Sequence, residues 1–521
     1  MKSTLGTLAF LAYTSSVLAK DFVIDLVNAN LAPDGFNRST VVANGTYPGP
    51  LLSLNKGDLI NVQLNNRLTD GTMRRSTTLN FDGVRMNSPQ FFDEGSDFIT
   101  QCPLGPNASY TYTVQPQADV AGTFWYHSQL GVQYVDGFRG PLVIYDPDDP
   151  AADLYDVDDE STIIQVGDWW QNSTTPLLAG YEATGIVPVS DSGTVNGVGR
   201  FQGGPEVPWP VINVEQGKRY RFRVINQSAR NVFTISFDNH NMTVIEADGE
   251  ATEPFVTDSI QLLAGQRYSV VVEANQTVDN YWFNAPFVGG TASRNLHQNA
   301  TLTRAILRYA GAPDADPTTP LTLGPNNGTG GIIEALLVPL VPDPVPVPVM
   351  NLTFNLAVVT GQAVWQINNV SYLSPDTPTL VKVLGGANSS DAFNVTENTF
   401  ILPGNATIQV DFPPNDDDEA HPFHLHGNNF WVIKSNSSDV VNTVNPIKRD
   451  VVGVGAAGTT IRFNTNQPAA AFFHCHIFWH KQAGLASVML SDPDAVRAST
   501  HPSGDWEDLC AAYDALPEDE K

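Results

Sequence analysis

A strand-like pattern that recurs three times most constrains how this chain can fold. Each copy has an apolar segment, a tight turn with glycine, and a segment in which apolar and polar residues alternate; the copies span residues 51–68, 211–228 and 400–412. Each is followed by two further strand-like segments. Alternation with a period of two is typical of half-buried strands, and a repeat at long spacing indicates homologous modules. The sequence therefore predicts an all-β protein of three consecutive β-sandwich domains.

The chain length agrees with this prediction, because 521 residues would make about three domains of ordinary size. An acidic connector at 144–161 and a Gly/Pro-rich stretch at 310–330 mark the expected boundaries. We therefore predict domains at 20–150, 151–312 and 313–521, the last including a C-terminal tail. The proline-rich segment 338–349 is expected to be extended and to lie across the surface.

Residues 1–19 are predicted to be a secretory signal peptide. Lys2 gives a positive start, an apolar stretch follows, and Val17-Leu18-Ala19 resembles a cleavage site. Roughly fifteen Asn-x-Ser/Thr sites would suit a glycosylated, extracellular protein. The most apolar later stretch, 332–350, contains two acidic residues and five prolines, which argues against a membrane span.

The net charge limits the partners that the chain can bind, and the cysteines indicate a metal ligand and a disulfide. A formal net charge of −28 disfavours nucleic acid and anionic membranes as partners. There are three cysteines, and Cys475 lies between His474 and His476, which suits a metal ligand. By elimination, Cys102 and Cys510 are predicted to form a disulfide.

The strongest chemical signal is a set of histidines around Cys475. Two imidazoles and a thiolate are the donors of a blue-copper site, and His421, Cys475 and His480 supply them. Isolated histidines are more often buried core residues than ligands. Six histidines in the short segments 421–427 and 474–480, around one cysteine, favour copper instead.

Over nearly all of residues 20–521, the chain resembles the laccases, the fungal three-domain type of multicopper oxidase, most clearly at 122–147, 421–427 and 474–486. The resemblance implies three cupredoxin-like Greek-key domains. In that family, a type 1 copper takes electrons from phenols and a trinuclear copper cluster reduces O2 to water. By similarity, His421, Cys475 and His480 would hold the type 1 copper, with Leu485 at the axial position without ligating. His474 and His476 would carry electrons onward.

The resemblance also implies eight histidine ligands for the trinuclear cluster, and three of these positions differ here. At the type 2 copper, Asn80 would stand beside His424. At one type 3 copper, Asp82 would stand beside His127 and His476. At the other, Gln129 would stand beside His426 and His474. Amide oxygens are poor ligands for copper that cycles through Cu(I). The cluster is therefore expected to be absent or crippled.

Several alternatives remain open for this region. The five surviving histidines could form a packed polar interface between domains one and three, or hold a residual metal. Asp82, His127 and His476 make a two-histidine, one-carboxylate set that suits Fe(II), or a single Cu or Zn. Glu94 matches the family's proton-relay acid. Arg230 stands where many laccases carry the acid that accepts the phenol's proton, which a cation cannot do.

Three functions follow. The first is a secreted, laccase-like blue-copper redox protein that exchanges electrons with a small-molecule or protein partner and reduces O2 weakly or not at all. The second is an active laccase with altered cluster ligands. The third is a non-catalytic partner of an active laccase.

Overall fold

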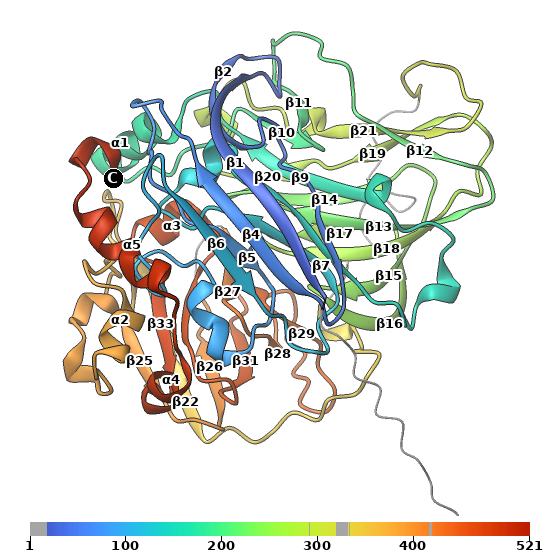
Figure 1. Ribbon diagram of the computed structural model, residues 1–521. Helices are drawn as coiled ribbons and strands as arrows, with labels where there is room; N and C mark the ends of the chain where they lie inside the picture. Colours follow the sequence, from blue (N-terminus) through green and yellow to red (C-terminus); the bar gives the residue numbers. More distant parts are fainter. Residues whose placement is uncertain (1–17, 291, 319–331, 333, 416–418) are drawn as a thin grey trace, which may run out of the picture.

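The computed structural model describes residues 18–290, 292–318, 332, 334–415 and 419–521, and it consists mainly of strands (Figure 1). The all-β prediction is confirmed. Of the predicted signal peptide, residues 1–17 lie outside the described residues, and the first strand begins at Ala19. Within the described part, no helix is long and apolar enough to cross a membrane.

The first two domains each pair two sheets. In the first domain the orders are β2 (Arg38–Ala43), β1 (Ala19–Leu31), β4 (Leu59–Asn66), β6 (Ser109–Val114), and β3 (Leu52–Asn55), β8 (Arg139–Tyr145), β7 (Gly122–His127), β5 (Asn80–Asp82). In the second they are β11 (Val198–Arg200), β10 (Ser192–Val195), β9 (Ile163–Trp169), β13 (Arg219–Asn226), β18 (Arg267–Glu273), β15 (Met242–Ala247), β16 (Glu250–Thr257), and β12 (Val211–Val214), β21 (Arg304–Tyr309), β19 (Asn280–Asn284), β14 (Val232–Phe237), β17 (Ile260–Leu262), with β20 (Phe287–Val288) on β14.

The third domain repeats this plan and adds a hairpin. Its sheets run β22 (Met350–Thr353), β26 (Thr407–Phe412), β31 (Thr459–Asn464), β28 (Phe430–Lys434), β29 (Lys448–Arg449), and β25 (Thr399–Leu402), β33 (Ala486–Ser491), β32 (Ala470–Cys475), β27 (His421–Leu425), β30 (Val451–Val454), with the hairpin β23 (Leu356–Val358) and β24 (Trp365–Ile367). The helices are α1 (Thr174–Thr184), α2 (Thr379–Leu384), α3 (Phe478–Gln482), α4 (Pro493–Ser499) and α5 (Gly504–Asp514).

The repeated sequence pattern has one structural meaning in all three domains. Its tight turn carries the chain from one sheet of a sandwich to the other: β3 to β4, β12 to β13, and β25 to β26. The first two turns have glycines at positive φ, Gly57 and Gly217, both at 87°. The third uses Asn405, at 50°, which is a residue that tolerates the left-handed region. The pattern therefore marks the same crossover between sheets in all three sandwiches.

The second group of candidate residues lies where the first and third domains meet. The exposed strand β6 alternates between buried and accessible residues, whereas β7 and β32 are buried along their whole length. A strand covered on both faces has no solvent side on which to place polar residues. The polar side chains of these two strands therefore need internal partners.

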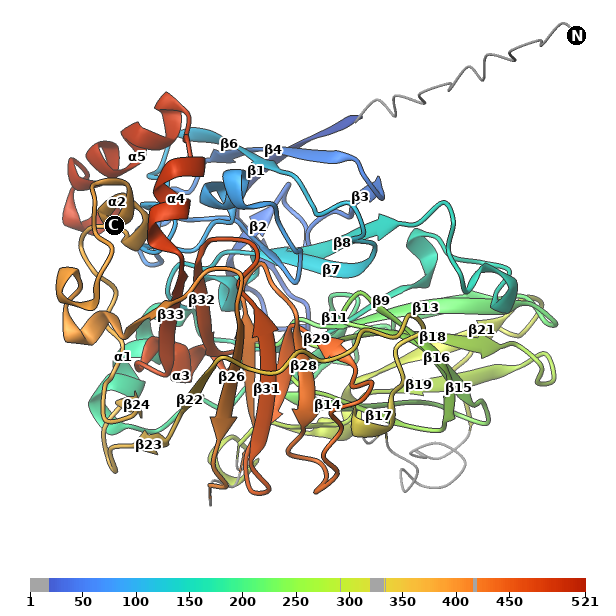
Figure 2. The ribbon, with the colours of Figure 1, turned by 90° about the horizontal axis from the view of Figure 1, so that it is seen from below.

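The C-terminal tail lies against the first domain (Figures 1 and 2). Cys510 of α5 forms the predicted disulfide with Cys102, across 408 residues of sequence. The proline-rich segment runs along the edge of β16, where the Glu253 amide donates to the Val338 carbonyl at 2.8 Å. Exposed side chains such as Val347 confirm that this segment lies at the surface.

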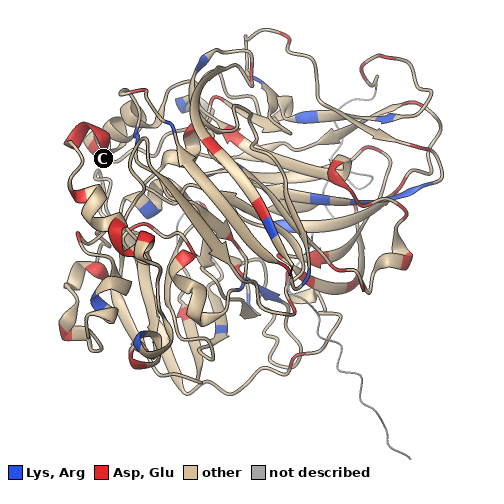
Figure 3. Ribbon diagram, viewed as in Figure 1, with Lys and Arg blue, Asp and Glu red and all other residues tan. Residues whose placement is uncertain are grey.

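Acidic residues are distributed over all three domains (Figure 3). Several carboxylates depart from the usual surface position of such groups, and three of them, Asp82, Glu94 and Asp450, lie close to histidines and are at most 1 % exposed. Buried carboxylates require charged or hydrogen-bonding partners, and here the partners are mostly histidines.

Candidate metal centres

The first candidate centre is a buried triangle of His421, Cys475 and His480. Cys475 ends β32, His421 begins the neighbouring strand β27, and α3 turns His480 back toward the cysteine. The Cys475 sulfur lies 3.7 Å from Nδ1 of His421 and 3.9 Å from Nδ1 of His480, and the two nitrogens are 3.2 Å apart. Metal–ligand bonds of about 2.0–2.3 Å in a trigonal plane would separate the ligand atoms by about 3.5–3.7 Å. The donor set and its spacing fit a type 1 copper ion.

Apolar and aromatic side chains enclose this triangle. Leu485 is fully buried, and its carbonyl accepts a 3.0 Å hydrogen bond from the Cys475 amide. The Trp365 ring packs on His480 at 4.3 Å between centroids and on His421 at 4.9 Å. Burial, followed by the charges of His421 and Arg230, holds the pKa of His480 well below its usual range. A neutral imidazole is the form that binds a metal.

The second candidate centre gathers the five remaining histidines and their three substituted neighbours. His426 and His474 face one another, with 2.8 Å between their Nε2 atoms. The Gln129 amide nitrogen lies 3.1 Å from Nε2 of His474 and 3.5 Å from Nε2 of His426. Its oxygen has no hydrogen-bond partner among the described residues. The structure thus brings together His426, His474 and Gln129, the third set of positions expected from the sequence.

Asp82 contacts one more histidine than the alignment of positions suggested. Its Oδ2 lies 3.1 Å from Nε2 of His476 and 3.7 Å from Nε2 of His127, as expected. Its Oδ1 lies 2.6 Å from Nε2 of His424, the histidine that the sequence paired with Asn80. Burial opposes ionisation, but the charge of His424 and contacts with the three histidines hold the pKa of Asp82 well below its usual range.

The partner histidine carries the matching charge. Burial favours neutral His424, but the Asp82 charge and a hydrogen bond to Asp450 raise its pKa to about 10. Nδ1 of His424 lies 3.0 Å from the Asp450 carbonyl, and Arg267 holds the Asp450 carboxylate with two contacts of 2.7 Å. Asp450 and Arg267 were missed by sequence reasoning, because neither belongs to a His or Cys motif.

Asn80 belongs to a separate hydrogen-bond network around Glu94. Its amide donates to the Glu94 carboxylate at 2.7 Å and lies 3.3 Å from Nδ1 of His426. Glu94 also contacts Nδ1 of His426 directly and accepts from the Ser96 hydroxyl at 3.0 Å. Burial works against its ionisation, yet the charge of His426 and these hydrogen bonds lower the pKa of Glu94. The predicted relay acid, Glu94, therefore lies beside the histidine group. Of the three side chains named here that contact it, His426 is the titratable one.

Arg230 is the remaining position singled out by the sequence. Its guanidinium forms two 2.9 Å contacts with Glu419, the residue two before His421, and donates to the Pro188 carbonyl at 3.0 Å. The pair links the second domain to the third. Glu419 is the last residue of an acidic run, which was the only sequence signal that could have pointed to it.

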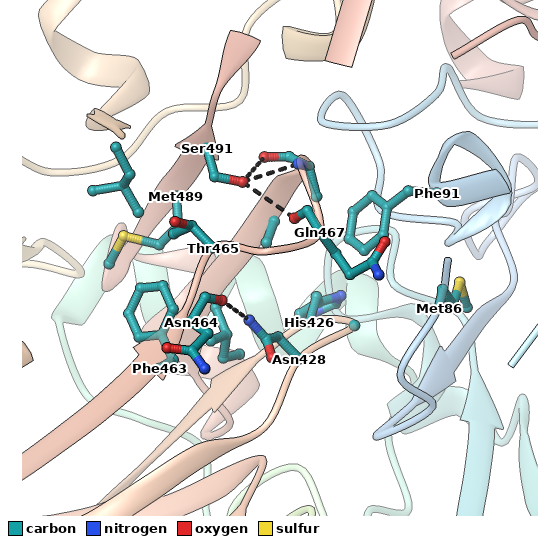
Figure 4. A pocket seen from close by; sticks show the side chains of 15 residues that line it. Met86, Phe91, His426, Asn428, Phe463, Asn464, Thr465, Gln467, Met489 and Ser491 are labelled. Atoms are coloured by element: carbon teal, nitrogen blue, oxygen red, sulfur yellow. Dashed lines mark hydrogen bonds between the residues drawn. The ribbon is translucent and has the colours of Figure 1, made fainter. Parts of the chain in front are cut away.

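A hydrogen bond connects the two centres through the chain. Nδ1 of His474 lies 2.9 Å from the carbonyl oxygen of Cys475, so this histidine touches the backbone of the cysteine in the first triangle. On the other side of the histidine group, a cavity of about 20 Å³ lies beside His426, Phe91 and Gln467 (Figure 4). That volume is enough for about one water molecule.

The two centres differ in how well they match copper. The triangle has a complete set of copper donors. The second group offers five imidazoles, one carboxylate and two amides, and its Asp82 and His424 neutralise one another. An eight-imidazole cluster does not fit these residues. Buried polar atoms without hydrogen-bond partners in the described part of the chain, such as Nε2 of His127 and Oε1 of Gln129, are nevertheless present there.

Three β-sandwiches with a buried Cys–His–His triangle beside a group of interdomain histidines define a cupredoxin-based copper protein. The chain belongs to the multicopper oxidase family: three family models described as "Multicopper oxidase" match residues 26–149, 160–312 and 372–495. Within that family it is of the fungal laccase type.

Curated relatives and solved structures support the same family assignment. The chain is 45% identical to Laccase-2 of Agaricus bisporus over 516 residues, 97% of each sequence. It is 54% identical to the laccase-like protein claX of Ampulloclitocybe clavipes over 419 residues, 73% of this chain and 96% of the relative. The laccase of Botrytis aclada superposes with a TM-score of 0.84 at 28% identity, covering 96% of this chain and 93% of that one. The iron-import multicopper oxidase Fet3p gives 0.83 at 26% identity, covering 96% and 98%.

Proposed function

We propose that the chain is a secreted blue-copper redox protein on a laccase scaffold, which exchanges single electrons but reduces O2 to water weakly or not at all. One observation carries this proposal: the complete Cys–His–His triangle lies beside a histidine group in which Asp82 and His424 are ion-paired at 2.6 Å. A carboxylate and a histidine of opposite charge at this distance are not arranged to surround a shared oxygen-reducing cluster.

His421, Cys475 and His480 would hold the type 1 copper, which supplies one-electron chemistry when bound. Leu485, at the axial position, contributes no ligand, and an apolar neighbour disfavours the more highly charged Cu(II) state. The protein would therefore be an oxidant of relatively high potential. The Trp365 ring shields the imidazoles of His421 and His480 from water. The hydrogen bond between His474 and the Cys475 carbonyl would give electrons a path from the type 1 copper toward the second histidine group.

Arg230 bears on the kind of electron donor. Its guanidinium occupies the place of a proton-accepting acid and is held by Glu419. Donors that release an electron without a proton, or a redox partner protein, would suit this surface better than phenols. The leader-like N-terminus and the many glycosylation sites support an extracellular location.

The test is copper content together with oxygen uptake, using ferrocyanide as a donor without an acidic proton. We expect the copper-reconstituted protein to be blue, to hold well under four coppers, and to take up oxygen no faster than Cys475→Ser. A matched gain-of-function variant, Asn80→His with Asp82→His and Gln129→His, should bind about four coppers and consume oxygen.

Two results would contradict the proposal. Close to four coppers with rapid oxygen uptake in the unmodified protein would favour the second candidate, an active laccase whose Asp82 serves as a ligand. A colourless, copper-free protein would favour a non-catalytic partner of an active laccase.

A further inference from the structure

We propose that Asp82, His127 and His476 bind one divalent first-row transition-metal ion, and that His424 positions the carboxylate for it. This inference rests on the proposed function, because it requires that the trinuclear cluster does not form. It adds a second, mononuclear metal site to the type 1 centre.

The spacing of the three side chains suits a single ion. Asp82 Oδ2 lies 3.1 Å from Nε2 of His476 and 3.7 Å from Nε2 of His127, and the three ligand atoms all lie within 4.8 Å of one another. Ligands bound tetrahedrally at about 2.0–2.2 Å are separated by about 3.4 Å. A metal ion therefore fits between these atoms with only small side-chain movements.

His127 is oriented as a ligand. Its Nδ1 lies 2.8 Å from the Ser128 carbonyl, which fixes the proton there and leaves Nε2 without one. Nε2 is fully buried and has no hydrogen-bond partner within the described residues. A buried acceptor without a partner is costly, and a metal ion would satisfy it. The Trp125 ring packs on His127 at 4.4 Å and on His476 at 5.5 Å, which holds both imidazoles in place.

The second oxygen of Asp82 explains the role of His424. Oδ1 contacts Nε2 of His424, whose Nδ1 is held by Asp450, which is in turn held by Arg267. Nε2 of His424 faces Asp82 Oδ1 at 2.6 Å and its Nδ1 is held by Asp450, so His424 acts on the site through Asp82. Such partners of a ligating carboxylate fix its direction and strengthen metal binding.

The donor set limits the identity of the ion. Two imidazoles and one carboxylate are found in mononuclear iron(II) sites and in zinc sites, with positions left for water or substrate. The ligands also come from two domains, since Asp82 and His127 belong to β5 and β7 whereas His476 follows β32. A bound ion would therefore cross-link the first and third domains and raise the unfolding temperature.

The experiment starts from Cys475→Ser, which removes the type 1 thiolate. The metal-free variant is titrated separately with cobalt(II), zinc(II) and copper(II), and metal per chain, visible cobalt absorption and thermal midpoint are recorded. We expect one ion per chain, cobalt bands without thiolate charge transfer, and a higher midpoint. Adding Asp82→Ala should abolish all three. Adding Asp82→Asn, which keeps the side-chain shape, should weaken binding at least tenfold.

Gln129→Ala provides the matched control, because Gln129 contacts His426 and His474 and is not part of the triad. In the Cys475→Ser background, the protein with Gln129→Ala should still bind one ion per chain. His424→Gln should keep that stoichiometry, weaken binding by about 10- to 100-fold, and alter the cobalt spectrum.

The outcomes separate this inference from the proposed function. No bound ion in folded Cys475→Ser overturns the site but leaves the blue-copper proposal intact. An ion that survives Asp82→Ala and is lost with Gln129→Ala places the metal at His426 and His474 instead, which also overturns it. Three coppers in Cys475→Ser would mean that a cluster forms, and both proposals would fail.

Discussion

At the scale of single residues, burial and neighbouring charges decide how the pKa of an aspartate shifts. Most carboxylates of this acidic chain are solvated, whereas Asp82 is buried, and the charge of His424 and contacts with three histidines hold its pKa well below the usual range. Asp93, at the end of a short 3₁₀ turn (Ser88–Asp93), is also buried but lacks a cationic partner among its hydrogen bonds. It accepts from the Tyr110 hydroxyl and, at 2.9 Å, from the Thr113 amide.

Asp93 should make stability depend on pH. Burial raises its pKa from 3.8 to about 7, so between these values the folded protein holds a proton that the unfolded chain has released. Stability from this group is complete below about pH 4 and is lost as the pH rises through about 7, by up to about 4 kcal/mol. Asp93→Asn cannot ionise, and we expect its urea midpoint to fall less than that of the unmodified protein over this range.

The comparison is made by urea unfolding of the metal-free protein at several pH values. The exposed helix residue Asp494 supplies a control, since Asp494→Asn should follow the unmodified protein closely. Equal pH dependence in Asp93→Asn and the unmodified protein would show that Asp93 ionises freely in the folded state.

At the scale of elements, α5 shows how a short helix is held at the end of a long chain. Ser503 caps its first turn by accepting from the Trp506 amide. Trp506 and Tyr513 pack edge-on against Phe92 and Phe98 of the first domain, at 6.2 and 5.6 Å between ring centroids. The disulfide to Cys102 adds a covalent link to the same domain.

Replacing both cysteines, Cys102→Ala with Cys510→Ala, should cost about 2–5 kcal/mol, because the unfolded chain regains the freedom of a long loop. We expect faster hydrogen exchange in α5 than in the unmodified protein and a lower unfolding temperature. The neighbouring helix α4 serves as an internal reference and should exchange at its original rate. Unchanged exchange in α5 would mean that its aromatic contacts alone hold it.

At the scale of the whole molecule, the domains are joined by charged groups as well as by apolar packing. Arg230 of the second domain meets Glu419 of the third through a two-point contact close to the type 1 triangle. Its guanidinium is 5 % exposed, so the pair is largely shielded from water. This contact ties the second domain to the third, two residues before His421.

Arg230→Gln should lower the unfolding free energy by about 1–3 kcal/mol, because Glu419 loses its charged donor. It should also raise the rate of electron transfer from phenols relative to the rate from ferrocyanide, since the released Glu419 carboxylate can accept the phenol's proton. Arg308→Gln breaks an exposed pair with Asp314, 6 residues further along the chain, and should change stability by less than about 0.5 kcal/mol. If both variants match the unmodified protein in stability and rate ratio, the interdomain pair has neither role.

The sequence by itself determined the architecture and the triangle. Period-two alternation, repeated three times, specifies strands and their buried faces through local geometry, and the CHIFWH segment brings His480 back to Cys475 within one short loop. The disulfide also followed from the sequence, because the third cysteine had a metal-ligand context.

Only the tertiary structure decided the partners of the second histidine group. Asp82 and His424 come from different domains, 342 positions apart in the numbering of the chain, and no local pattern records which oxygen meets which nitrogen. The same holds for Asp450 with Arg267 and for Glu419 with Arg230. Interdomain contacts between charged groups depend on how completed sandwiches pack, and that packing is set by whole surfaces rather than by any short stretch of residues.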